Sequence, residues 1–226
     1  MKFKNILLAA FTGFAIFACN KHEIIPAPEQ RVKLDFHFQG YMRGTFTEFT
    51  QNVDGFDLET NKTKTISPNS FSRATYYSML KSSQKNISLK LLIGEALWDG
   101  LENADPDINA FTDMFKNYPT PKFSSGASMY AGNDTTTFDI EYKDVNGNIW
   151  IGDTALGAIR KIEFTYLSQE SDVTGDYMKY IAKIDIQLCR RWWEYHYDNL
   201  GLLDDSSFHY DSWQITDGIL KGWFKR

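Results

Sequence analysis

Histidine and aspartate side chains near the C-terminus are the residues best suited to metal chemistry. His196 and His209 lie there together with Asp204, Asp205 and Asp211. Zinc sites hold their ligands at defined spacings, such as pairs of cysteines or an HExxH helix, and the sequence contains neither pattern. The remaining two histidines are His22 and His37. We therefore interpret the histidines as surface residues and predict no metal site.

Nucleophilic catalysis would need a base and an orienting group beside the nucleophile. Cys189 and His196 could supply the first two, but the sequence offers no identifiable third partner, no GxSxG, no P-loop and no dinucleotide fingerprint. Residues 105–109 begin like a calcium loop, yet Ala110 replaces the glycine and Lys116 the bidentate glutamate. We predict a non-catalytic protein without a cofactor.

The run RRWWEYHYDN at residues 190–199 is the most distinctive ligand-binding candidate. In a strand, alternate side chains share a face. One face would carry Trp193, Tyr195 and Tyr197, and the other Trp192, Glu194 and His196. One interpretation is a platform on which a sugar ring stacks, with Glu194 and His196 as hydrogen-bonding groups. The alternative is a strand packed between the core and a covering loop such as 200–212.

The N-terminus has the composition of an export signal. Lys2 and Lys4 precede an apolar stretch, Ile6 to Ala18, that is shorter than the roughly 20 residues a bilayer span needs. The stretch ends in Ile16-Phe17-Ala18-Cys19, which resembles a bacterial lipobox. That resemblance implies a signal peptide at residues 1–18 and a Cys19 that becomes the acylated first residue of the mature chain. The protein is then a cell-envelope lipoprotein anchored to the outer membrane.

Residues 19–30 are expected to form a tether between the lipid and the domain. Pro26 and Pro28 favour extended conformations, and the charged residues keep the segment solvated. The tether should reach on the order of 35 Å at about 3.3 Å per residue. A single domain over residues 31–226 would then stand clear of the membrane surface.

Charge and cysteine content narrow the possible partners. The net charge is -5, and loss of Lys2 and Lys4 with the signal peptide makes it -7. The basic doublets Arg160-Lys161 and Arg190-Arg191 are too short for a nucleic-acid-binding stripe, so we exclude nucleic acid as a partner. Because acylation of Cys19 leaves one thiol, no internal disulfide can form, and the domain must be stabilised by its core.

Alternation of apolar and polar residues predicts an all-β fold. The clearest predicted strands span 32–38, 87–93, 138–142, 162–166 and 178–188, with shorter ones near 45–50, 72–80, 208–215 and 219–224. The strand at 178–188 is the longest and should lie in the middle of a sheet. We predict an antiparallel β-sandwich of about eight to ten strands, with a closed β-barrel as the alternative.

Turn and cap residues add three local predictions. Asn146-Gly147 and Asp217-Gly218 each lie between apolar segments and favour tight type I′ hairpins. One short helix should begin with Asp105 as its N-cap and Pro106 at its first position, because the apolar residues after them recur at helical spacing, and it should end at Tyr118-Pro119. The apolar positions of that helix are Ile108, Phe111 and Phe115.

Three stretches resemble the small β-rich surface or periplasmic lipoproteins of Bacteroidota. They are the leader ending in Cys19, FDIEYKDVNGNIW and WQITDGILKGWF. Such proteins bind glycans, bind host or partner proteins, or assist outer-membrane complexes. The resemblance implies a non-catalytic ligand-binding domain, with glycan binding favoured and assembly of an outer-membrane complex as the alternative. A hydrolase ranks behind both.

Overall fold

Long strands with alternating apolar residues dominate the computed structural model, which describes residues 31–67, 70–99, 105–117, 119–125, 136–197 and 203–226. Residues 31–226 form one unit. The expected signal peptide, Cys19 and the tether at 19–30 lie outside the described residues. No helix in the described part of the chain is long and apolar enough to cross a bilayer.

A single large sheet makes up most of the unit. In chain order its strands are β1 (His37–Met42), β2 (Thr45–Thr50), β3 (Phe56–Thr65), β4 (Ser72–Ser82), β5 (Ser88–Trp98), β6 (Lys122–Phe123), β7 (Thr137–Lys143), β8 (Ile149–Gly152), β9 (Arg160–Asp172), β10 (Gly175–Tyr197) and β11 (Leu203–Lys225). They are ordered β2-β1-β11-β10-β8-β7-β5-β4-β3, with β9 beside β10 and β6 beside β7. All neighbours are antiparallel except β6 and β7.

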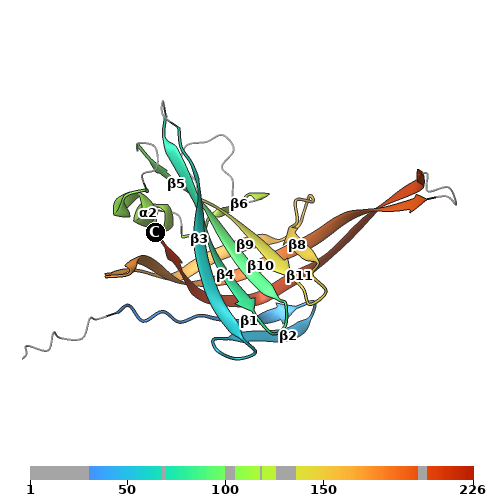
Figure 1. Cartoon of the computed structure of the whole chain (residues 1–226), viewed down its shortest axis with the longest axis horizontal. Helices are drawn as coiled ribbons and strands as arrows, with labels where there is room; N and C mark the ends of the chain where they lie inside the picture. The colour runs from blue at the N-terminus through green and yellow to red at the C-terminus, as the bar shows by residue number, and fades with distance from the viewer. Residues whose placement is uncertain (1–30, 68–69, 100–104, 118, 126–135, 198–202) are drawn as a thin grey trace, which may run out of the picture. The chain divides into compact units, whose positions relative to one another are not determined.

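The sheet curls into a half-barrel (Figure 1), so that its two ends enclose one core. Tyr180 of β10 is buried and donates a hydrogen bond of 3.0 Å to Ser78 of β4, although the two strands are not neighbours in the sheet. The apolar residues that alternate along β10 are all buried: Met178, Tyr180, Ala182, Ile184, Ile186 and Leu188. The predicted all-β class with one short helix is confirmed, and the described residues form eleven strands in place of the predicted eight to ten.

The helix α2 (Ile108–Lys116) packs its apolar side onto this core. Phe111 lies 5.0 Å from Tyr76, and Phe115 lies 5.2 Å from Phe224, between ring centroids. The N-cap is Asp107, whose carboxylate accepts from the amide of Ala110, and not Asp105 as the sequence predicts. Asp105 instead forms ion pairs with two lysines of β3, Lys62 and Lys64.

The first predicted hairpin is confirmed, but its turn differs from the expected type. β7 and β8 pair antiparallel across residues 144–148. A type I′ turn needs two consecutive residues with positive φ, whereas in this loop only Gly147 has one. The carboxylate of Asp144 holds the loop by accepting from the amides of Asn146 and Asn148 and from the indole of Trp150.

The second predicted hairpin, at Asp217-Gly218, is wrong because β11 continues straight through these residues. Ile184 pairs with Gly218 and Ile186 with Ile215, so the strand carries a bulge at this point. Asp217 has φ +51°, and its amide donates 2.9 Å to Asp185 of β10. A Cβ on Gly218 would lie 2.9 Å from the carbonyl oxygen of Ile184. Asp217-Gly218 therefore forms a bulge within β11. The positive φ that favours this pair in tight hairpins is also found in bulges.

Candidate functional site

The far halves of β10 and β11 extend beyond the rest of the sheet as a two-stranded ribbon (Figure 1). β10 pairs with β8 only at Leu188 and Cys189, and β11 pairs with β1 only from Ile215 onward. Residues 190–197 and 203–211 therefore pair with each other and, within the described residues, with no third strand. We call this segment the ribbon, and it spans roughly 25 Å at about 3.3 Å per residue.

Strand alternation and register divide the ribbon into two faces. The outer face lies on the side away from the core residues Leu188 and Ile215, and it carries Arg191, Trp193, Tyr195, Ser206, Phe208 and Tyr210. The inner face continues the core side of the strands and carries Arg190, Trp192, Glu194, His196, Asp205, Ser207, His209 and Asp211. Tyr197 ends β10 opposite Leu203, also by register.

The outer face exposes four aromatic side chains. Their exposed fractions are 55% for Trp193, 53% for Tyr195, 52% for Phe208 and 44% for Tyr210. Trp193 and Phe208 are in contact, with ring centroids 5.3 Å apart and planes tilted by 58°. An aromatic side chain has roughly 150–250 Å² of surface, so the four half-exposed rings present roughly 400 Å². Exposed apolar patches of a few hundred Å² commonly mark interaction surfaces.

On the inner face, by contrast, several aromatic and charged side chains contact one another. Trp192 stacks on His209 with centroids 5.0 Å apart and planes 11° apart, and Arg190 lies 4.5 Å from the Trp192 ring centre. His209 is 3.0 Å from a carboxylate oxygen of Glu194 and 2.9 Å from the hydroxyl of Ser207. Glu194 is thus engaged within the ribbon and lies on the opposite face from the exposed rings.

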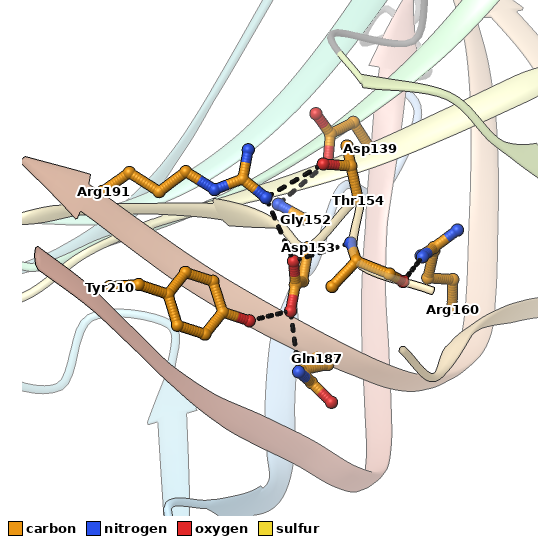
Figure 2. Close-up of polar contacts among 9 residues, drawn as sticks. Asp139, Gly152, Asp153, Thr154, Arg160, Gln187, Arg191 and Tyr210 are labelled. Carbon is orange, nitrogen blue, oxygen red and sulfur yellow. Dashed lines mark hydrogen bonds and ion pairs between the residues drawn. The ribbon is translucent and has the colours of Figure 1, made fainter. Parts of the chain in front are cut away.

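A buried carboxylate anchors the base of the ribbon's outer face. Asp153 follows β8 directly and is fully buried. Its side chain accepts hydrogen bonds from Gln187 at 2.7 Å and from the hydroxyl of Tyr210, and Arg191 lies 3.4 Å away. Figure 2 shows these three side chains pointing at the carboxylate from the two long strands. Arg191 also donates 3.0 Å to the hydroxyl of Thr154.

This clamp, formed by Asp153 with Gln187, Arg191 and Tyr210, changes the protonation behaviour of its members. Burial raises the pKa of Asp153, but hydrogen bonds from Tyr210, the Ala155 amide, Gln187 and Cys189 outweigh burial, and the net pKa lies below the ordinary 3.8. The hydrogen bond to Asp153 is the main reason that the pKa of Tyr210 is raised, with burial second. Asp153 is therefore an ionised structural partner at neutral pH, not a proton donor.

Arg191 and Tyr210 are tied to this carboxylate and at the same time lie on the outer face beside the exposed rings. The guanidinium carbon of Arg191 is 5.8 Å from the Tyr210 ring centre. The clamp thus holds the first residues of the ribbon against the loop that follows β8. It holds Arg191 and Tyr210 in place at the base of the aromatic surface.

The structure does not bring together the candidate catalytic pair, Cys189 and His196. Cys189 and His196 lie seven residues apart on one extended strand, which separates them by roughly 23 Å. Burial is the main cause that raises the pKa of the Cys189 thiol, and the charge of Asp153 adds to it. His37 contacts Glu48 at 2.8 Å. Among the described residues, no three His, Cys, Asp or Glu side chains gather as a metal site would require.

The structure divides five of the six predicted ligand-binding residues between the two faces, and the side chain of the sixth, Tyr197, lies outside the described part of the chain. Trp193 and Tyr195 lie on the exposed outer face, while Trp192, Glu194 and His196 lie on the inner one. Residues 203–211 form the partner strand of the ribbon instead of a loop that covers it. Phe208, Tyr210 and Arg191 complete the outer face and were missed. Phe208 and Tyr210 alternate with Ser207, His209 and Asp211, which indicates a strand, but the expected turn at Asp217-Gly218 directs that strand to a different partner.

Comparison with protein-family models, with curated proteins and with solved structures finds no match for this chain.

Proposed function

We propose that this protein is a lipid-anchored module of the bacterial cell envelope that binds a partner protein through the outer face of the ribbon. The observation that carries the proposal is the set of four half-exposed aromatic side chains on one face of a ribbon without a third strand among the described residues. The anchor is acylated Cys19, and residues 19–30 form the tether. The domain itself is a non-catalytic binding or assembly module.

Both edges of the ribbon are free of a third strand among the described residues. An isolated two-stranded hairpin is marginally stable in water, and proteins ordinarily protect unpaired strand edges. Here residues 190–197 and 203–211 lack a neighbouring strand within the described part of the chain. A partner that adds a strand or packs on the rings would satisfy the free backbone groups and bury the aromatic surface together.

The chemistry of the outer face also favours a protein partner. Trp and Tyr side chains are enriched among the residues that dominate binding energy at protein interfaces. The tilt of 58° between Trp193 and Phe208 leaves these two rings without a common flat surface. Glu194 is paired with His209 on the inner face, away from the exposed rings. The sequence predicted that this residue would bind sugar hydroxyls.

A matched pair of tyrosine substitutions tests the proposal. Tyr195 is 53% exposed on the ribbon, and Tyr166 is 47% exposed on β9. Native envelopes should be cross-linked and solubilised from cells that carry wild-type protein, Tyr195→Ala or Tyr166→Ala. We expect one co-purifying protein whose recovery falls at least tenfold with Tyr195→Ala and is unchanged with Tyr166→Ala. Equal loss or equal retention in the two variants would contradict the assigned surface.

Glycan binding is the second candidate function. Trp193 and Tyr195 are neighbours on one face of β10, roughly 7 Å apart along the strand, which suits stacking of successive sugar rings. A glycan array probed with the same three proteins separates the candidates. A glycan signal that disappears with Tyr195→Ala, without a captured protein, would make the ligand a carbohydrate.

The proposed anchor has its own test. Mass spectrometry of the mature protein should show a first residue, Cys19, that carries acyl groups, and Cys19→Ala should abolish incorporation of labelled fatty acid. Each buried methylene contributes about 0.8 kcal/mol, so an anchor with more than one chain should resist extraction by salt. A native product that retains residues 1–18, or one without acyl mass, would exclude the lipoprotein.

A further inference from the structure

A pocket of about 520 Å³ opens beside β9 and β10, with β6 forming part of its wall. It is lined by six charged residues: Lys122, Arg160, Lys161, Glu163, Lys183 and Asp185. Its volume falls within the roughly 300–1,000 Å³ of small-molecule sites. The ribbon contributes no residue to this pocket, so a ligand bound here is independent of the function proposed for the ribbon.

The charges of the pocket do not balance. The register of β9 and β10 puts Lys183 opposite Glu163 and Lys161 opposite Asp185, so these four charges have oppositely charged cross-strand neighbours. Lys122 and Arg160 are left as an excess of two positive charges, in a chain whose net charge is -5. Within the described residues, neither has a carboxylate at ion-pair distance.

Arg160 is held in a fixed position at this pocket. Its Nη2 donates to the carbonyl oxygen of Ala155, and its guanidinium carbon lies 5.1 Å from the ring centre of Phe123. Its Nε is buried and, among the described residues, has no hydrogen-bond partner. A guanidinium held by a carbonyl and a ring loses little freedom when it binds an anion, which favours binding.

The segment that carries Lys122 is also held in place and is partly apolar. The amide of Phe164 donates 2.8 Å to the carbonyl oxygen of Pro119, and the amide of Lys122 donates 3.0 Å to that of Thr136. Pro121 and Phe123 of this segment and Ile162 of β9 line the pocket with apolar surface. The site thus combines cations with an apolar floor.

We propose that this pocket binds the oxyanion of a small organic ligand, a carboxylate or phosphate carried on a sugar-sized ring. Arg160 and Lys122 neutralise the anion, and the apolar residues contact the face of the ring. A ring without a charged group leaves the two cations unpaired and binds weakly.

Calorimetry on the full chain in detergent tests this site, with glucuronate and glucose 6-phosphate as probes and glucose as the neutral comparison. Exposed charge pairs contribute up to about 1 kcal/mol each, so reversing one charge with Lys122→Glu should weaken anion binding about tenfold. Lys116→Glu, at the exposed end of α2, makes the same charge change outside the pocket and should alter binding by less than about twofold.

Amide chemical shifts provide a second readout that does not depend on any substitution. The anionic probes should shift the signals of Lys122, Arg160 and Lys183 and leave those of the ribbon unchanged, and Tyr195→Ala should bind them like wild type. Binding of one anion alone identifies the preferred oxyanion. Absence of binding by both anions, equal binding of glucose, or an undiminished affinity of Lys122→Glu would overturn the proposal.

Discussion

The two halves of β10 share one partner strand but differ in their surroundings. Residues 177–189 have neighbours on both sides, β11 on one and β9 or β8 on the other. Residues 190–197 have only β11, within the described chain. In the first half the inward side chains are buried without exception from Met178 to Leu188. In the second half the large residues Trp193 and Tyr195 lie on the opposite, outer face and are half-exposed.

Large aromatic residues therefore serve two purposes in one strand. Tyr180 is buried in the core, where it hydrogen-bonds to Ser78 and stacks on Phe224 at 4.9 Å. Trp193 and Tyr195 contribute little burial to the isolated domain, so folding alone does not explain them. Their surface is available to a partner, which is the basis of the proposed function.

Truncation of one side chain in each half of β10 should give the largest contrast between them. Leu188 is fully buried, and Leu188→Ala should reduce the free energy of unfolding by about 2–5 kcal/mol. Trp193→Ala should change it by less than about 0.5 kcal/mol, because the side chain lies largely outside the core. Urea denaturation measures both. A loss of more than about 2 kcal/mol for Trp193→Ala would make the ribbon part of the core.

The clamp at Asp153 joins the two halves, and its removal should give the next largest effect. Asp153→Asn keeps the shape but removes the charge that accepts from Tyr210, Gln187 and Arg191. The neutral amide is a poorer acceptor at this buried position, and an unsatisfied buried polar group costs about 1–3 kcal/mol, which denaturation would measure. Hydrogen exchange should accelerate at Arg191 and Tyr210 more than in the core half of β10.

Asp211→Asn is the matched control for that substitution, since Asp211 is exposed on the inner face of the ribbon. It should change stability by less than about 0.5 kcal/mol. Equal exchange rates at the ribbon's base in wild type and Asp153→Asn would show that the clamp does not hold the ribbon.

The sequence predicted the features that depend on neighbouring residues. Period-two alternation identified the strands, because burial of one face requires it locally. The cap and the apolar spacing identified α2 to within two residues of its N-cap, and Asn146-Gly147 identified the hairpin between β7 and β8. Each of these signals is contained in fewer than about fifteen residues.

Features that depend on distant residues were not predictable in this way. Asp217-Gly218 has the same backbone preferences in a hairpin and in a bulge, and only the pairing of Ile184 and Ile186 decides between them. The clamp joins Asp153 to residues 34, 38 and 57 positions away. No local pattern marks such contacts. The aromatic run at residues 190–199 was identifiable from the sequence as a candidate binding surface. Which of its two faces is exposed depends on the pairing with β11, so the sequence alone could not predict it.

The smallest expected effect is the pH dependence of the stability that the clamp provides. Because the folded-state pKa of Asp153 is lowered, its ionised form stabilises the fold fully above about pH 3.8, and this contribution is lost as pH falls through the lowered value. The stability difference between wild type and Asp153→Asn should therefore be constant between pH 7 and pH 5. This difference should become smaller as the pH approaches 3. Protonation of the other carboxylates changes the stability of both proteins equally. A difference that stays constant or widens on acidification would mean that Asp153 is not held as an anion by Tyr210 and Gln187.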